Sequence, residues 1–313
     1  MDIPVFLING FLESGKTLFI QEIINEGQFD EARSVLLVAC EEGIEEYDME
    51  LLKKKNIHLE VVESEEDLNE NFFRECQKRY RPEAIVIEYN GMWDAEKVFD
   101  IKLPRRWGIV QVIVTVDTNT FTSYWNNMRS LMVNQFKEAD MVVFNRCEGQ
   151  VKKSTLRSSV RSVNPRAQII YESSEGVTDK IDDDDLPFDL KADVIEINDE
   201  DFGLWYVDAI DNPAKYDGKT VKIKGQVYRA PNMGKTAFVP GRFAMTCCAD
   251  DVGFVGFYCN YENAGLLKQK DWVMVTGKIK VEYKDDYQGE GPVIYATDVK
   301  PCEKASEDLV YFS

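Results

Sequence analysis

The sequence predicts an α/β protein that begins with the parallel sheet of a P-loop NTPase, with helices on both faces, and ends in a smaller OB-like β-barrel. In the first ~170 residues, short β-branched runs alternate with polar stretches of helical period. A phosphate-loop pattern follows the first apolar run, and from Ala192 onward strands are separated only by turns. The 313 residues, 44% hydrophobic and 30% charged, suffice for two globular domains.

Seven apolar runs form the predicted parallel sheet. Ile85-Val86-Ile87 is apolar throughout, which is typical of a strand buried on both faces. The single histidine, His58, lies in an apolar-polar alternation and is interpreted as structural. The predicted strands are Ile3–Ile8, Val35–Ala39, Leu59–Val62, Ala84–Ile87, Val112–Val116, Met141–Phe144 and Gln168–Ile170.

The second half predicts a barrel reached through an acidic linker. A serine-rich stretch, the run Asp182–Asp185 and Pro187 interrupt the alternation. Five strands follow a helix over Asp201–Ile210, with another helix expected over Glu262–Lys268, which is the element order of an OB fold. The predicted strands are Thr220–Tyr228, Ala237–Thr246, Gly253–Cys259, Trp272–Val281 and Val293–Val299. The expected domains are 1–172, a linker over 173–191, and 192–313.

Composition narrows the expected partners. The net charge is −19, and the barrel segment alone has 14 Lys and Arg against 20 Asp and Glu. Single-stranded nucleic acid requires a positive groove, so no nucleic-acid partner is expected. There is no apolar run long enough for direct membrane insertion and no basic leader, and seven irregularly spaced cysteines favour reduced thiols. A cytoplasmic protein is expected.

The strongest motif is a P-loop between the strand Ile3–Ile8 and an amphipathic stretch beginning at Leu18. Backbone amides of such a loop surround phosphate oxygens, the lysine neutralises the terminal phosphates, and the last hydroxyl ligates Mg²⁺. The pattern comprises Gly10, Phe11, Leu12, Glu13, Ser14, Gly15, Lys16 and Thr17, with Leu18 following.

Two further segments fit a guanine nucleotide. Glu88 follows the strand Ala84–Ile87 at the sheet edge next to the P-loop, and is predicted as a Mg²⁺ carboxylate or a helix cap. Asn145-Arg146-Cys147-Glu148 resembles the guanine-reading Asn-Lys-x-Asp, in which a carboxylate accepts from the base N1–H and amine. Glu148 has the same charge on a longer arm. Guanine preference and relaxed specificity both remain open.

Residues 1–175 resemble the CobW-type P-loop GTPases, a family of metallochaperones. The matching stretches are Pro4 to Thr17, Glu88-Tyr89-Asn90-Gly91, the run from Gln135 through Asp140 to Asn145, and Asn164 to Ile169. The resemblance implies GTP and Mg²⁺ as ligands. It also places Glu41 on the family's first switch glutamate, as a ligand of Mg²⁺ or of its bound water.

The chain departs from that family at the metal motif. Family members have a Cys-x-Cys-Cys motif after the switch, but no cysteine occurs between Glu45 and Glu75. The resemblance therefore does not imply that this chain delivers a metal. The C-terminal segment, through Tyr216 to Arg229 and Arg242 to Asp251, resembles the soluble part of a bacterial two-subunit permease family. The C-terminal resemblance suggests a membrane permease as a partner, and a metal-requiring client protein is the alternative partner.

Cys247 and Cys248 are the alternative metal site. Thiolates suit Zn²⁺, but neighbouring residues of a strand point to opposite faces, so both bind one ion only across a bulge. A structural role for the pair remains open beside the Zn²⁺ site.

The sequence thus predicts a Mg²⁺-dependent GTPase with Lys16, Glu41 and Glu88 as its catalytic candidates. No internal arginine finger can be assigned, so slow intrinsic turnover is expected. A nucleotide-gated transporter subunit with vestigial hydrolysis and a P-loop kinase are the alternatives.

Overall fold

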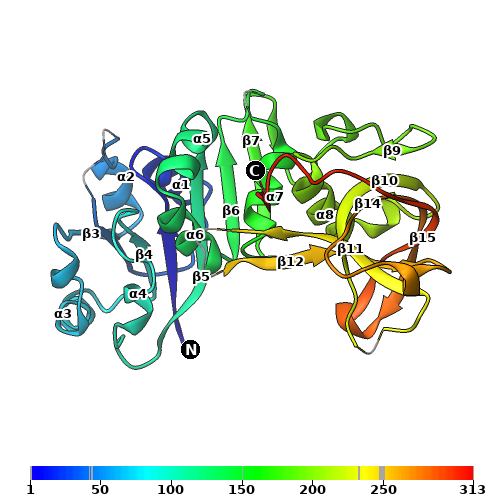
Figure 1. Ribbon diagram of the computed structural model, residues 1–313. Coiled ribbons are helices and arrows are strands. Elements are labelled where there is room, and N and C mark those ends of the chain that lie inside the picture. Colours follow the sequence, from blue (N-terminus) through cyan, green and yellow to red (C-terminus); the bar gives the residue numbers. More distant parts are fainter. Residues whose placement is uncertain are drawn as a thin grey trace. The chain divides into compact units, whose positions relative to one another are not determined.

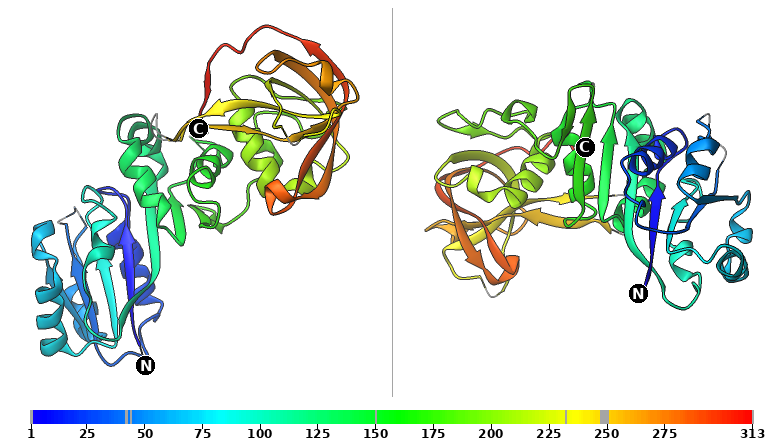
Figure 2. Two further views of the ribbon diagram at one scale, coloured as in Figure 1. Left: turned by 60° about the horizontal axis from the view of Figure 1, so that its bottom comes forward. Right: turned by 180° about the vertical axis from the view of Figure 1, so that it is seen from behind.

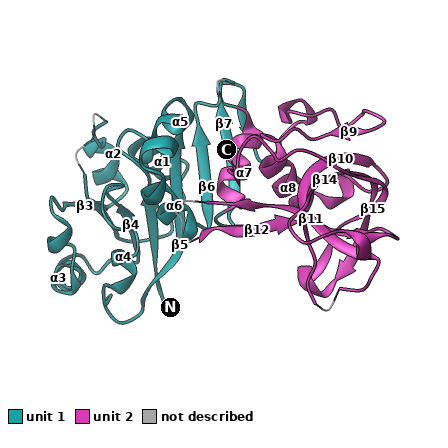
Figure 3. Ribbon diagram, in the orientation of Figure 1, with its two compact units in different colours: residues 1–151, 163–180 teal, residues 152–162, 181–313 magenta. Residues whose placement is uncertain are grey.

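A computed structural model describes residues 2–41, 43, 45–149, 151–231, 233–246 and 251–312. The chain forms two compact units (Figure 3). Unit 1 comprises Met1–Val151 and Val163–Lys180, and unit 2 comprises Lys152–Ser162 and Ile181–Ser313. The chain therefore enters unit 2, returns to unit 1 and enters unit 2 again.

Unit 1 contains an eight-stranded sheet in the order β3-β2-β4-β1-β5-β6-β7-β8 (Figure 1). The first seven strands are parallel, and β8 is antiparallel to β7. The predicted P-loop NTPase sheet is confirmed. The strands are β1 (Ile3–Asn9), β2 (Val35–Ala39), β3 (Ile57–Val61), β4 (Ala84–Glu88), β5 (Trp107–Asp117), β6 (Met141–Asn145), β7 (Gln168–Ser173) and β8 (Gly176–Thr178).

Helices cover both faces of this sheet, as the views in Figure 2 show. Alternate residues of one strand belong to different cores: Leu36 of β2 packs with Phe73 of one helix, whereas Leu37 packs with Ile20 of another. Period-two alternation thus separates two apolar layers. The helices are α1 (Lys16–Asn25), α2 (Met49–Lys54), α3 (Glu70–Tyr80), α4 (Lys97–Asp100), α5 (Thr118–Asn127) and α6 (Arg129–Lys137), with a 3₁₀ turn, η1, at Glu65–Asp67.

The sheet order brings functional loops to one edge. β1 lies between β4 and β5, so the carboxyl ends of these three parallel strands meet where the P-loop begins. In open parallel sheets, ligands bind beyond the carboxyl ends of the strands, where the strand order reverses. The fold therefore positions the P-loop at the expected binding edge.

The segment 173–191, which is predicted as an acidic linker, contains a strand and buried apolar side chains. Strand β8 pairs with β7 within it, and Leu186, Phe188 and Leu190 are buried in the core of unit 2. Burying each of these apolar side chains is favourable by about 1.5–3 kcal/mol. This gain in free energy explains why these side chains pack in the core of unit 2 although their neighbouring residues are acidic.

Unit 2 contains a closed five-stranded barrel, in agreement with the predicted fold class. The closed circuit is β10-β11-β13-β15-β14, because β10 also pairs with β11. The elements are α7 (Lys153–Arg161), η2 (Asp183–Asp185), β9 (Ile195–Glu196), α8 (Phe202–Asp211), η3 (Pro213–Lys215), β10 (Thr220–Tyr228), β11 (Ala237–Ala244), β12 (Gly253–Gly256), β13 (Tyr258–Asn260), η5 (Ala264–Leu266), β14 (Trp272–Lys284), η6 (Asp285–Tyr287), β15 (Gly289–Pro301) and β16 (Leu309–Val310).

Two sequence predictions in the barrel need correction. The third predicted strand is divided into β12 and β13 by the fully buried Phe257. The ring centre of Phe257 lies 5.1 Å from that of Trp205 in α8. The helix expected over Glu262–Lys268 is only the 3₁₀ turn at Ala264–Leu266.

Arg242 is buried inside unit 2, with 1% of its surface exposed. Its guanidinium donates to the backbone oxygens of Asp199 and Glu307, each at 2.8 Å. It also lies 5.7 Å from the ring centre of Phe202 and 5.8 Å from that of Trp272. One side chain thus joins three segments of the unit.

In the described part of the chain, no helix has both the length and the apolar character needed to cross a bilayer.

Candidate nucleotide site

The loop between β1 and α1 has a backbone that only glycine accommodates at two points. Gly10 has φ +141°, and a Cβ there would lie 2.4 Å from the backbone oxygen of Thr115. Gly15 has φ +93°, and its Cβ would lie 2.5 Å from Nδ2 of Asn145. The two predicted glycines therefore let the loop curl against β5 and β6.

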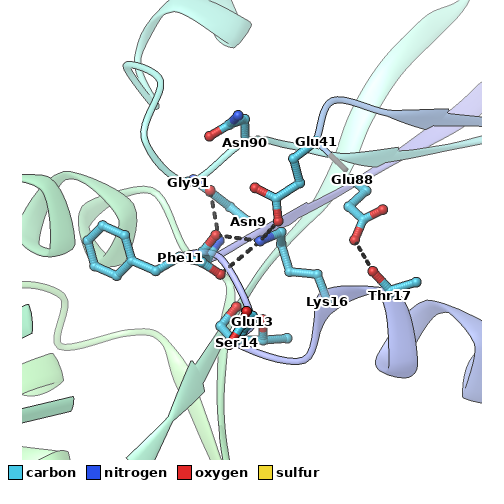
Figure 4. Close-up of polar contacts among 12 residues, drawn as sticks. Asn9, Phe11, Glu13, Ser14, Lys16, Thr17, Glu41, Glu88, Asn90 and Gly91 are labelled. Atoms are coloured by element: carbon cyan, nitrogen blue, oxygen red, sulfur yellow. Dashed lines mark hydrogen bonds and ion pairs between the residues drawn. The ribbon is translucent and has the colours of Figure 1, made fainter. Parts of the chain in front are cut away.

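Lys16 begins α1 and is turned back over this loop (Figure 4). Its ammonium donates to the backbone oxygens of Gly10 at 2.7 Å and Phe11 at 2.9 Å, and it forms an ion pair with Glu41. Only 2% of the Lys16 side chain is exposed. The predicted phosphate lysine and the predicted switch glutamate are thus in direct contact.

Thr17 and Glu88, the two predicted Mg²⁺ ligands, are also brought together. The Thr17 hydroxyl donates to Oε1 of Glu88 at 2.6 Å, and the Tyr47 hydroxyl donates to Oε2 at 2.6 Å. Burial raises the pKa of Glu88 above its ordinary value, while Thr17, Tyr47 and Lys16 act in the opposite direction. The carboxylate is therefore held by hydroxyl donors in a nearly closed environment.

The segment after β4 lies against the P-loop. A Cβ on Gly91 would lie 2.1 Å from the backbone oxygen of Gly10, so the approach requires glycine. Gln135 of α6 fixes this turn by donating to the backbone oxygen of Gly91 at 2.9 Å. The stretch from Glu88 to Gly91 is thereby held beside the phosphate loop.

Cys40, at the end of β2, is buried next to these carboxylates. Its backbone amide donates to the backbone oxygen of Glu88 at 2.9 Å. Burial raises the pKa of its thiol, and the charges of Glu88 and Glu41 raise it further. This environment favours a neutral thiol over a metal-binding thiolate.

The predicted base-reading residues lie at the carboxyl end of β6 and in the loop that follows it. Asn145 donates from Nδ2 to the backbone oxygen of Ser14 at 2.6 Å, which links it to the P-loop. Arg146 donates to the backbone oxygen of Glu13 at 3.3 Å and pairs with Asp117. Oε1 of Glu148 accepts from the backbone amide of Ser174 at 3.2 Å.

Two adjoining cavities contain most of the predicted site. The phosphate cavity is lined by Glu13, Gly15, Lys16, Thr17, Leu18, Glu41, Gly43, Glu45, Glu88 and Arg146. The base cavity is lined by Gly15, Leu18, Phe19, Glu22, Thr115, Val143, Asn145, Arg146, Glu148, Glu172, Ser173 and Ser174.

Sequence reasoning missed Tyr47 and Glu172. Tyr47 is separated from the P-loop by an intervening strand, and no motif marks it. Glu172 could have been predicted from the sequence, because it follows an apolar run in β7 just as Glu88 follows the apolar run of β4.

Within the described residues, no group of three or more Cys, His, Asp or Glu side chains could hold a metal ion. Cys247 and Cys248 lie outside the described residues, so the Zn²⁺ site there stays a prediction. For Mg²⁺, the hydroxyl of Thr17 and the carboxylate of Glu88 are the oxygen ligands that this ion prefers.

Comparison with known proteins decides the family. Residues 4–171 match the model of the CobW/HypB/UreG nucleotide-binding domain. The chain belongs to the CobW/HypB/UreG family. The resemblance inferred from residues 1–175 is thus confirmed. Residues 177–312 of this CobW/HypB/UreG protein match the DUF1980 C-terminal domain, in agreement with the second resemblance.

Individual relatives are distant. UPF0703 protein YcgQ of Bacillus subtilis (strain 168) is 24% identical over 117 residues, covering 37% of this chain and 41% of YcgQ. The chain thus spans about two fifths of that relative. The Zn(II)-bound YjiA GTPase of E. coli is 21% identical, with a TM-score of 0.41, over 54% of this chain and 57% of YjiA. Hydrogenase maturation factor HypB of Archaeoglobus fulgidus is 20% identical, with a TM-score of 0.42, over 55% of this chain and 82% of HypB.

Proposed function

We propose that this CobW/HypB/UreG protein binds GTP together with Mg²⁺ and hydrolyses it with slow intrinsic turnover. The supporting observation is that Lys16, Thr17 and Glu88 meet in one cavity at the carboxyl ends of β1 and β4. Phosphoryl transfer depends mainly on positioning and charge neutralisation, which these groups are suited to supply.

The chain's own residues have distinct roles in this proposal. Lys16 binds the terminal phosphates once Glu41 releases its ammonium, and the P-loop amides orient them. Thr17 and Glu88 hold Mg²⁺, which neutralises phosphate charge when bound. Glu41, Glu42 and Glu88 are the candidates for orienting the attacking water. The carboxylates of Glu41 and Glu88 line the phosphate cavity, and Glu42 lies outside the described residues.

The guanine assignment rests on the second cavity. Glu148 and Asn145 line it, and Arg146 lies between the two cavities. Carboxylate oxygens accept from the N1–H and amine of guanine, whereas adenine presents an acceptor at N1. We therefore infer a preference for GTP over ATP.

Calorimetry with GTP and ATP, together with phosphate release in Mg²⁺, tests the proposal. Wild type should bind GTP more tightly than ATP, Glu148→Ala should reduce that preference, and Lys16→Ala should abolish binding of both. Lys54→Ala removes an exposed lysine of α2 and serves as the matched control. Unchanged GTP binding by Lys16→Ala would refute the proposal.

A second candidate function is a nucleotide-gated subunit of a membrane transporter. It is favoured by the match of residues 177–312 to the DUF1980 C-terminal domain and by the similarity to YcgQ. Tight GTP binding with no detectable phosphate release in Mg²⁺ would favour this function over the GTPase. Both functions are proposed for the cytoplasm.

A metal-requiring client protein is a further proposed partner of the GTPase. Zinc measured by elemental analysis of chelator-free protein, and lost in Cys247→Ser with Cys248→Ser, would support a metal-linked role. Equal zinc in wild type and variant would remove the pair as the site.

A further inference from the structure

The base cavity contains a carboxylate that no motif assigns. In the register of β6 and β7, Val143 is opposite Ile170. Asn145 lies two residues beyond Val143, and Glu172 lies two residues beyond Ile170. Since alternate residues of a strand share a face, Asn145 and Glu172 stand side by side at the carboxyl ends of adjacent strands. Both line the base cavity.

The hydrogen bonds already formed leave this cavity rich in acceptors. Nδ2 of Asn145 is engaged by Ser14, and Oε1 of Glu148 is engaged by the amide of Ser174. Oδ1 of Asn145 is buried without a partner among the described residues. No donor in the described part of the chain is bonded to the carboxylate of Glu172.

Guanine presents two donor groups on one edge, N1–H and the 2-amino group. Oε1 of Glu148 already accepts one hydrogen bond, and Oε2 has no donor among the described residues. A second carboxylate beside Glu148 therefore gives each of the two guanine donors a carboxylate oxygen of its own. Glu172 is partly buried, whereas Glu22, the remaining carboxylate of the cavity, is exposed on α1. A hydrogen bond to a partly buried charge is stronger than one to a solvated charge.

We propose that Glu172 is a specificity-determining residue that accepts a hydrogen bond from the 2-amino group of guanine, while Glu148 accepts from N1–H. This inference rests on the proposed guanine nucleotide binding, and it names the part of the base that Glu172 recognises.

The electrostatics of the cavity agree with this assignment. Burial raises the pKa of Glu172, and the charges of Glu22 and Glu148 raise it further against the opposing effect of Arg146. A carboxylate under such a penalty is stabilised when a ligand brings a donor to it.

The test compares GDP with IDP, whose base lacks only the 2-amino group. Calorimetry on wild type should show tighter binding of GDP. Glu172→Ala should lower GDP affinity by about tenfold while leaving IDP affinity nearly unchanged, because one charge-assisted hydrogen bond is lost. Retained IDP binding also shows that the variant is folded. Glu172→Gln, which keeps the shape of the side chain, should give a smaller loss in the same direction.

Two matched variants make the outcome decisive. Glu175→Ala removes an exposed carboxylate from the adjacent β7–β8 turn, outside the cavity, and should leave the GDP-to-IDP ratio unchanged. If Glu172→Ala weakens GDP and IDP equally, or if Glu22→Ala lowers the ratio instead, the assignment of Glu172 is overturned. If wild type binds ADP as tightly as GDP, the guanine proposal itself fails, which is a different result.

Discussion

The carboxylate of Glu41, which follows β2, and the ammonium of Lys16 form an ion pair beside the phosphate loop, where their side chains are only 9% and 2% exposed. A phosphate oxygen of a nucleotide would therefore compete with the carboxylate of Glu41 for the ammonium of Lys16. The switch glutamate must leave before the P-loop lysine can bind a nucleotide fully.

Glu41→Gln is expected to tighten the binding of GDP measured without Mg²⁺. The neutral amide competes less well with phosphate for Lys16, and the buried ammonium gains more from the ligand, so we expect an increase of about tenfold. Calorimetry in chelator measures it. Glu45→Gln is the control because Glu45 lines the same cavity without pairing with Lys16. Equal effects of the two substitutions would show that the pair does not control loading.

Glu88→Gln is expected to stabilise the nucleotide-free protein at neutral pH and to weaken its binding of Mg²⁺ with GTP. Burial raises the pKa of Glu88 above 4.5, so ionised Glu88 destabilises the folded state at neutral pH. This penalty disappears as the pH falls through the raised pKa toward 4.5. The melting temperature of Glu88→Gln should therefore be a few degrees higher than that of wild type at pH 7, which corresponds to about 1 kcal/mol in the free energy of unfolding.

The pH dependence separates this effect from a general change in packing. The stabilisation by Glu88→Gln should shrink on acidification, measured by thermal melting in a pH series. A constant stabilisation at every pH would contradict the electrostatic cause.

Gly15→Ala should reduce GTP binding by at least about tenfold, because its Cβ would displace Asn145 as well as strain the backbone. Gly149→Ala is a matched control. Gly149 has φ +92°, close to the +93° of Gly15, but a Cβ there would have no atom within 4 Å among the described residues beyond its chain neighbours. Backbone strain alone should cost each variant about 1–2 kcal/mol of stability. If both variants lose GTP equally, the contact with Asn145 is not the cause.

Arg242→Met should destabilise the protein by about 3 kcal/mol in urea unfolding, because the backbone oxygens of Asp199 and Glu307 lose their buried donor. Burial lowers the pKa of the Arg242 guanidinium. Lys224→Met is the control, since Lys224 pairs with Asp199 at 2.8 Å in a more exposed position. That variant should lose less than about 1 kcal/mol. Equal losses would assign the effect to the charge of Asp199 instead.

Local patterns predicted the fold well where burial is continuous. The limits of β2 are those expected, because an apolar run between polar segments marks a strand buried on both faces. The division into β12 and β13 at Phe257 was not predictable, because a barrel corner is set by closure between distant strands. Leu186, Phe188 and Leu190 were missed because the acidic residues around them hide their alternation.

The same limit applies to the site. Lys16 and Thr17 were found because one contiguous motif contains them. Glu88 was found because a carboxylate after a buried strand is conspicuous. Tyr47 and Glu172 reach the cavities from separate loops and strands, and only the three-dimensional register shows which of the many acidic side chains lies beside Asn145. The roles of all these residues stay predictions.

Helix α7 interrupts unit 1 in the sequence but belongs to unit 2, where Arg157 and Arg161 both pair with Asp211 of α8. No single cut of the chain can therefore yield the two units as separate intact pieces. A fragment ending after β8 would retain α7 without Asp211 and without the rest of unit 2. Such a fragment is expected to aggregate, so truncation experiments would report on this orphaned helix as much as on nucleotide chemistry.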